Sequence, residues 1–219
     1  MIGEAGRGDA GAFLARLVRL DPAALVRLRY VRAGVAEMWA MLPFGALAVR
    51  ALATDFESDI TVGAAALLNA LADPQAPWPP RRDEAWRWPI PPSHGRAVET
   101  VPALEVARVA TAASRTLRAA TEHGVSGRPV GERVVRDALL DHVPIVVTGA
   151  AGERVEVPQR LVQAVVRMGF LRPSGPSSPD AEQTERHQIV TVRLAGSWVG
   201  LAASYGSAWY RPTSSLHLR

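Results

Sequence analysis

The sequence predicts an α+β fold, and three stretches of hydrophobic periodicity carry that prediction. Apolar and polar residues alternate along Leu25–Tyr30 and along Ile189–Ser204, which is the period of a strand with one solvent-facing side. Along Thr100–His123 the apolar residues recur at helical spacing instead. We therefore expect an N-terminal antiparallel meander with helices, a Pro/Trp-rich crossing segment, and C-terminal helices with two β-hairpins.

The N-terminal region begins with an expected short helix capped by Asp9, whose side chain suits the first position of a helix. Two turn signals, Ala33-Gly34 and Pro43-Phe44-Gly45, then divide Leu25–Ala53 into three strands. The alanine content of this stretch leaves a helical hairpin as the alternative. Asp59 is expected to cap an Ala/Leu helix over Ile60–Leu71.

The clearest helix in the C-terminal region is Thr100–His123, with Val109 on its inward face and Gly124 after its end. A second helix is expected over Val130–His142. The alternating runs Ile145–Thr148 and Arg154–Val157 flank a Gly-Ala-Ala-Gly turn, which predicts a hairpin.

A short amphipathic helix should follow Pro158 and end at Gly169, with Phe170 making the hydrophobic contact that often accompanies a glycine C-cap. The Pro/Ser-rich stretch 172–186 reads as loose chain. Next, Gly196-Ser197 joins two alternating strands, the pattern of a two-residue hairpin turn.

These elements suggest three parts: an N-terminal α+β region over 1–72, a Pro/Trp-rich linker over 73–99 and a C-terminal α+β region over 100–219. Each folded region is small for an independent domain, so a single core shared by both remains open.

The composition is that of a globular protein whose 25 basic residues are all arginine, with a net charge of only +4. Coding in a GC-rich genome explains this bias. It still places every cation on a planar guanidinium group, which binds phosphate or carboxylate bidentately. The chain shows neither a signal peptide nor an apolar run of about 18 residues. We therefore expect a cytoplasmic protein that does not act at a membrane.

No pattern of residues indicates catalysis or a cofactor. The chain has no cysteine, and none of its five histidines pairs with another at helical metal-binding spacing. Phosphate-binding glycine loops and nucleophile motifs are missing as well. We expect no cofactor and no metal site. If the protein were an enzyme, Asp137, Asp141 and His142 would be the first residues to examine.

The segment from Pro77 to Pro92 is the most unusual part of the sequence. Its three tryptophans alternate with arginines, a composition that suits stacking on unpaired bases and contacting phosphate. The binding residues expected there are Arg81, Arg82, Trp86, Arg87 and Trp88. Pro77-x-x-Pro80-x-Arg82 also fits a polyproline ligand of a protein partner. The structural alternative is an ordered crossing loop whose tryptophans pack onto the protein's own core.

Arg27 and Arg29 should share one face of the first strand, where they would add to a basic surface. Taken together, these patterns predict a non-catalytic binding protein that engages nucleic acid or another polyanion through its Arg/Trp surfaces. The alternatives are a protein–protein adaptor that uses the Pro/Trp-rich segment, for example to bind an acidic protein, and an enzyme of unrecognised type.

Overall fold

The structure is a computed structural model that describes residues 2, 4–54, 56–73, 75–92, 95–123, 131–171 and 188–212. Within these residues it confirms the α+β class, with five α-helices, a separate β-hairpin and an eight-stranded antiparallel sheet in the order β4-β1-β2-β3-β10-β9-β8-β5. Gly124, Val130 and the stretch 172–186, for which the sequence made predictions, lie outside the described residues.

The chain divides into two compact units, and each is described by itself. Unit 1 contains Met1–Ile90, Ala164–Ser174 and Ser204–Ala208. Unit 2 contains Pro91–Gln163, Gly175–Ala203 and Trp209–Arg219.

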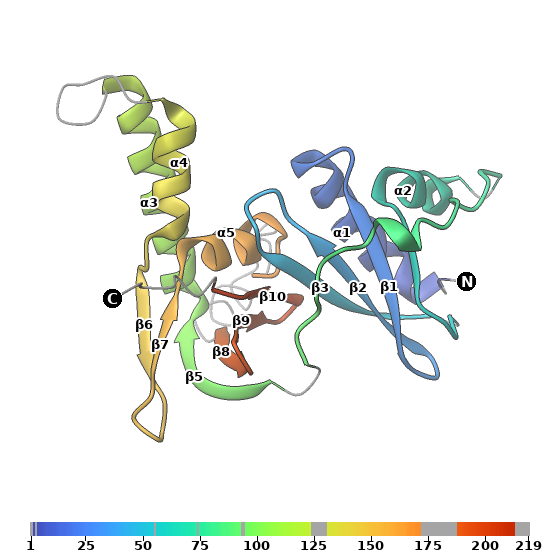
Figure 1. Cartoon of the computed structure of the whole chain (residues 1–219). Helices are drawn as coiled ribbons and strands as arrows, with labels where there is room; N and C mark the ends of the chain where they lie inside the picture. Colours follow the sequence, from blue (N-terminus) through green and yellow to red (C-terminus); the bar gives the residue numbers. More distant parts are fainter. Residues whose placement is uncertain are drawn as a thin grey trace, which may run out of the picture. The chain divides into compact units, whose positions relative to one another are not determined.

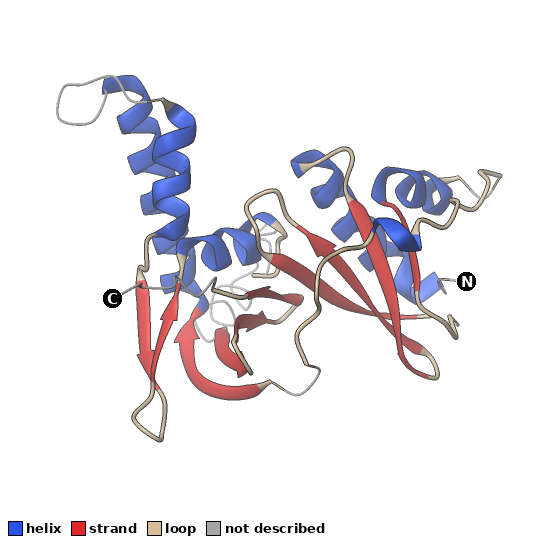
Figure 2. Cartoon of the chain, in the orientation of Figure 1, coloured by secondary structure: helices blue, strands red, loops and turns tan. Residues whose placement is uncertain are grey.

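The predicted meander of unit 1 is confirmed as β1 (Leu25–Arg32), β2 (Val35–Met41) and β3 (Leu47–Ala53), paired antiparallel in that order. Helices α1 and α2 lie against one face of these strands (Figures 1 and 2). Val26 and Leu28 of β1 are fully buried, whereas Arg27 and Arg29 alternate with them along the strand. The two-residue alternation therefore identified the core-facing side of β1.

Helix α1 (Glu4–Leu20) begins before Asp9, so the expectation that Asp9 caps it is wrong. Asp9 lies within the helix and forms an ion pair with Arg50 at 2.6 Å. Gly6, in the first turns, lies so close to the carbonyl oxygen of Ala53 that a side chain would not fit there. The first turns of the helix thus pack against the end of a distant strand, a contact that a local capping pattern cannot reveal.

The helix expected over Ile60–Leu71 is also corrected at its start. Ile60–Gly63 forms strand β4, and only Ala64–Ala72 forms helix α2. β4 pairs antiparallel with β1. Three consecutive β-branched residues, Ile60, Thr61 and Val62, favour a strand. Asp59 is consequently not a helix cap.

In unit 2 the helix expected over Thr100–His123 is likewise corrected at its start. Thr100 belongs to strand β5 (Arg96–Pro102), which pairs with β8. Helix α3 (Ala103–His123) starts only after Pro102 and is followed by α4 (Glu132–Asp141). The buried face of α3 is set by Val106 and Ala110, whereas Val109, expected to face inward, is half-buried.

The remaining hairpins agree with the sequence. β6 (Ile145–Thr148) pairs with β7 (Arg154–Val157), and β8 (Ile189–Ala195) pairs with β9 (Trp198–Ala203). Helix α5 (Gln159–Arg167) ends as expected at Gly169, which has φ of 66°. The N–H groups of Gly169 and Phe170 donate to the carbonyls of Val166 and Val165, the pattern of a Schellman C-cap.

Strand β10 (Gly206–Tyr210) was not predicted. In unit 2 its residue Trp209 is nearly buried and lies against two glycines, Gly95 and Gly200, at which an added Cβ would come within 2.7 Å of the ring. Small residues on separate segments thus make room for one large ring, a relation that exists only in the folded chain.

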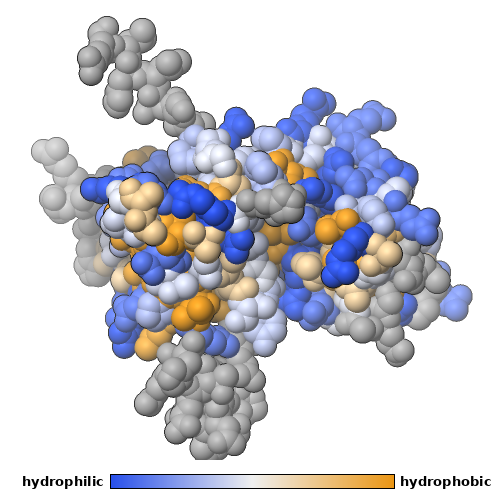
Figure 3. All heavy atoms as spheres, turned by 90° about the horizontal axis from the view of Figure 1, so that it is seen from below, coloured by the Kyte–Doolittle hydropathy of each residue, from blue (hydrophilic) through white to orange (hydrophobic). Residues whose placement is uncertain are grey.

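None of the described helices is long and apolar enough to cross a membrane. On the face shown in Figure 3, hydrophobic residues of the described chain form separate patches between hydrophilic ones.

The tight turn at Gly196 provides a test of the fold. Gly196 has φ of 60°, and nothing lies within 4 Å of the position of an added Cβ. Because there is room for a side chain, Gly196→Val should lose about 1–3 kcal/mol through backbone strain alone. Gly196→Asn is the control and should be nearly neutral, since asparagine tolerates left-handed φ. Urea unfolding followed by circular dichroism measures both, and equal midpoints for the two variants would contradict the turn assignment.

Candidate functional site

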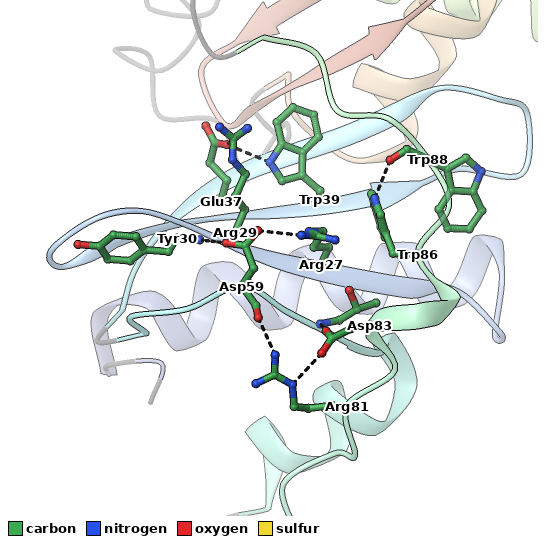
Figure 4. A network of polar contacts seen from close by, with 11 residues as sticks. Arg27, Arg29, Tyr30, Glu37, Trp39, Asp59, Arg81, Asp83, Trp86 and Trp88 are labelled. Carbon is green, nitrogen blue, oxygen red and sulfur yellow. Dashed lines mark hydrogen bonds and ion pairs between the residues drawn. The ribbon is translucent and has the colours of Figure 1, made fainter.

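The predicted site residues come from two places in unit 1: Arg27 and Arg29 from β1, and the others from the stretch 81–88 (Figure 4). Backbone hydrogen bonding attaches this stretch to β4. The Arg82 N–H donates to the Thr61 carbonyl at 2.7 Å, and the Thr61 N–H donates to Asp83 Oδ1 at 2.6 Å. β4 is the terminal strand of the sheet, so these bonds satisfy a sheet edge that would otherwise be open.

Two acidic residues, Asp59 and Asp83, hold Arg27 and Arg81 in place. Arg27 pairs with Asp59 at 2.9 Å, and the same carboxylate accepts the backbone N–H of Tyr30. Arg81 donates to Asp83 at 2.8 Å and to the Asp59 carbonyl at 2.9 Å. The hydrogen bond from Arg81, followed by that from the Thr61 N–H, lowers the pKa of Asp83 below its ordinary value. The Asp83 carboxylate therefore stays ionised and keeps the segment attached.

Arg29 has an acidic partner as well. Its guanidinium lies 3.9 Å from the carboxylate of Glu37 on β2. Glu37 also accepts a hydrogen bond of 2.9 Å from the indole N–H of Trp39, which is buried. On the sheet face, Arg29 is thus part of a local polar network.

Arg82 and Arg87 differ from the other three arginines of the predicted site. Both side chains are exposed, and neither has an ion-pair partner among the residues that the structure describes. Strands β1 and β2, Asp59 just before β4 and the stretch 81–88 together contain these five arginines and Arg32, and four carboxylates, which are Glu37, Asp59, Asp83 and Glu84. Net positive charge at this site is therefore small, and Arg82 and Arg87 are the guanidinium groups free to meet an anion.

Trp86 and Trp88 pack against each other. Their ring centroids are 5.1 Å apart in an edge-to-face arrangement, and the Trp86 indole N–H donates to the Trp88 carbonyl at 2.7 Å. Both side chains are half-buried. Part of the ring surface that would stack on bases is already used in holding the segment, which supports the ordered-loop alternative for these two residues.

Trp78, by contrast, is 43% exposed and rests on Phe56 with 5.5 Å between ring centroids. This pair was missed by sequence reasoning, as were the roles of Asp59 and Asp83. A local signal was the run of β-branched residues at Ile60–Val62, which indicates a strand but not its neighbours.

Two of the three residues singled out for possible catalysis, Asp137 and Asp141, form ion pairs with arginines of unit 2. Asp141 pairs with Arg160, and Asp137 lies 3.9 Å from Arg133. The backbone carbonyl of His142 accepts the N–H of Gln159 at 2.8 Å. In the described parts of the chain, no cluster of three or more acidic or histidine side chains is suited to hold a metal ion.

Two family models match the sequence. Residues 90–215 match a family described as Domain of unknown function (DUF8185), and residues 1–88 match one described as Domain of unknown function (DUF8010). No curated protein matches the chain.

Solved structures show a fold likeness over nearly the whole chain. The beta subunit of DNA polymerase from Streptococcus pyogenes aligns over 94% of this chain and 62% of its own, with a TM-score of 0.55 and 10% identity. The DNA polymerase sliding clamp from Pseudomonas aeruginosa aligns over 95% and 63%, with a TM-score of 0.51 and 9% identity. That from Caulobacter crescentus aligns over 94% and 63%, at 0.52 and 10%. This chain spans less than two thirds of the length of each, and at these identities the likeness concerns the fold.

Proposed function

The chain belongs to the family described as Domain of unknown function (DUF8185), and we propose that it is a non-catalytic binding protein that engages DNA. The observation that carries the proposal is the fold likeness, over 94–95% of the chain, to proteins named as DNA polymerase sliding clamps or beta subunits. The names of those proteins assign them to DNA polymerase, as its sliding clamp or its beta subunit. A binding role on the same fold is the simplest function to test for this chain.

The chemistry of the cations supports this proposal. Every basic residue is an arginine, whose planar guanidinium binds phosphate oxygens bidentately. In unit 1 the exposed Arg82 and Arg87, which have no ion-pair partner among the described residues, would contact phosphates, while Arg27 and Arg81 are held by Asp59 and Asp83. Because Trp86 and Trp88 are packed together, phosphate contacts rather than base stacking would supply most of the affinity.

Binding to fluorescent duplex and single-stranded oligonucleotides at several salt concentrations tests the proposal. For duplex DNA, the slope of log affinity against log salt should be about −0.9 per contacted phosphate. The double variant Arg82→Ser/Arg87→Ser should therefore flatten the slope by about 1.8 if each arginine meets one phosphate. Affinity should fall by a similar factor on duplexes of unrelated sequence, because phosphate contacts carry no sequence information.

Arg115→Ser/Arg118→Ser is the matched control. These two arginines are exposed on α3 of unit 2 and likewise have no ion-pair partner among the described residues. If the control flattens the slope and the test variant does not, the protein binds DNA through α3 and the site assignment is wrong. A folded parent protein that binds neither oligonucleotide at low salt would end the DNA proposal altogether.

A further inference from the structure

Covalent geometry fixes the backbone of Ala76–Pro80. Pro77, Pro79 and Pro80 each hold their own φ near −65°. The residues that precede a proline, Ala76, Trp78 and Pro79, are restricted to extended backbone by contact with the following ring. No described peptide bond is cis. These restraints favour polyproline II, a left-handed helix with three residues per turn, over Pro77–Pro80.

The burial of these residues repeats every three positions, as that helix requires. Pro79 is buried and Ala76, three residues earlier, is half-buried. Pro77, Trp78 and Pro80 are all exposed. One edge of the polyproline helix thus rests on unit 1, and its other two edges face outward.

The helix is attached to unit 1 at its middle residue and just after its C-terminal end. The Trp78 ring packs against Phe56. Immediately after Pro80, the Arg81 guanidinium donates to the Asp59 carbonyl at 2.9 Å, and the Arg82 N–H donates to the Thr61 carbonyl at 2.7 Å. The exposed prolines are therefore held in one conformation before any partner arrives. Such preorganisation removes most of the ordering cost of binding.

The chemistry of the exposed edges indicates the kind of partner. Proline has no N–H, so Pro77 and Pro80 cannot extend a β-sheet, and their rings carry no charge that would attract nucleic acid. Exposed prolines three residues apart in polyproline II are recognised by grooves lined with aromatic side chains. Arg82, exposed and without an ion-pair partner among the described residues, adds a positive charge beside them.

We propose that Ala76–Pro80, with Arg82 two residues beyond it, is a preformed polyproline-II docking segment for a protein whose groove is lined with aromatic side chains and bordered by carboxylates. The similar stretch Pro89-Ile90-Pro91-Pro92 has the same proline spacing. Ile90, however, is half-buried where Trp78 is exposed, so that stretch presents less apolar surface.

Purified SH3 and WW domains, which have aromatic grooves that take polyproline II, serve as probes of the full chain in titration calorimetry. We expect saturable one-to-one binding to at least one of them. Pro77→Ala/Pro80→Ala should weaken it at least tenfold, whereas the control Pro89→Ala/Pro92→Ala should change it less than twofold. No saturable binding up to about 1 mM, or an equal loss in both double variants, overturns the proposal.

Arg82→Glu keeps the prolines and therefore remains informative if the proline variant fails to fold. With an SH3 domain whose groove is acidic, the charge reversal should weaken binding at least threefold at low salt, and this loss should shrink at high salt because ions screen the pair. Unchanged affinity would overturn the assignment of an anionic groove. Nucleic acid is absent from these titrations, so their outcome is independent of DNA binding.

Discussion

Replacing Val106 with aspartate is expected to unfold the protein or to cost at least about 4 kcal/mol. Val106 lies on α3 and is fully buried, and its neighbour one turn on, Ala110, is nearly so. A carboxylate at this position would lose its hydration without gaining a described cationic partner. Urea unfolding followed by circular dichroism gives the change directly.

The matched control is Val109→Asp on the same helix. Val109 is half-buried, so its carboxylate would keep part of its hydration and the loss should be clearly smaller. Both variants place the same residue type in the same helix, which cancels the difference in helix propensity. If Val106→Asp unfolds at the same urea concentration as the parent, the buried face of α3 has been assigned incorrectly.

The second large effect is expected for Phe13→Ala in unit 1. Phe13 is 1% exposed and stacks on the fully buried Phe170, with 6.2 Å between ring centroids and 22° between planes. Truncation should cost about 3–5 kcal/mol, because it removes the buried ring and leaves a cavity that the surrounding sheet and helices fill only partly.

Phe56→Ala provides the comparison for Phe13. Phe56 is half-buried and contacts the exposed Trp78, so its loss should cost clearly less than that of Phe13. Chemical denaturation of the two variants side by side measures the difference. Equal losses would show that the Phe13–Phe170 contact is not a centre of the unit 1 core.

The sequence by itself determined the elements whose hydrophobic pattern and turn residues lie close together in the chain. Strand β1 and the hairpin around Gly196 are examples, because alternation marks the buried side of β1 and the two-residue turn sets the register of β8 against β9. The end of α5 at Gly169 is another, since a glycine with positive φ completes the cap within two residues.

For the candidate site, the sequence determined which residue types are present but not how they are used. Arg27 and Arg29 lie on one strand as expected, and Trp86 and Trp88 lie in the irregular segment. The pairing of Arg27 with Asp59 joins residues 32 positions apart, and the Trp86 indole donates to the Trp88 carbonyl within the folded segment. Whether these side chains bind a partner or their own neighbours is therefore a tertiary property.

Only the tertiary structure decided the elements that form through contacts distant in sequence. Ile60–Gly63 is a strand because β1 offers it a pairing edge, and Thr100 joins β5 because β8 is its neighbour. Helix α1 begins before Asp9, where Gly6 packs on the backbone of Ala53. In each case the element has a hydrogen-bonding or packing partner many residues away, which local propensities of less than about 1 kcal/mol per residue do not reveal.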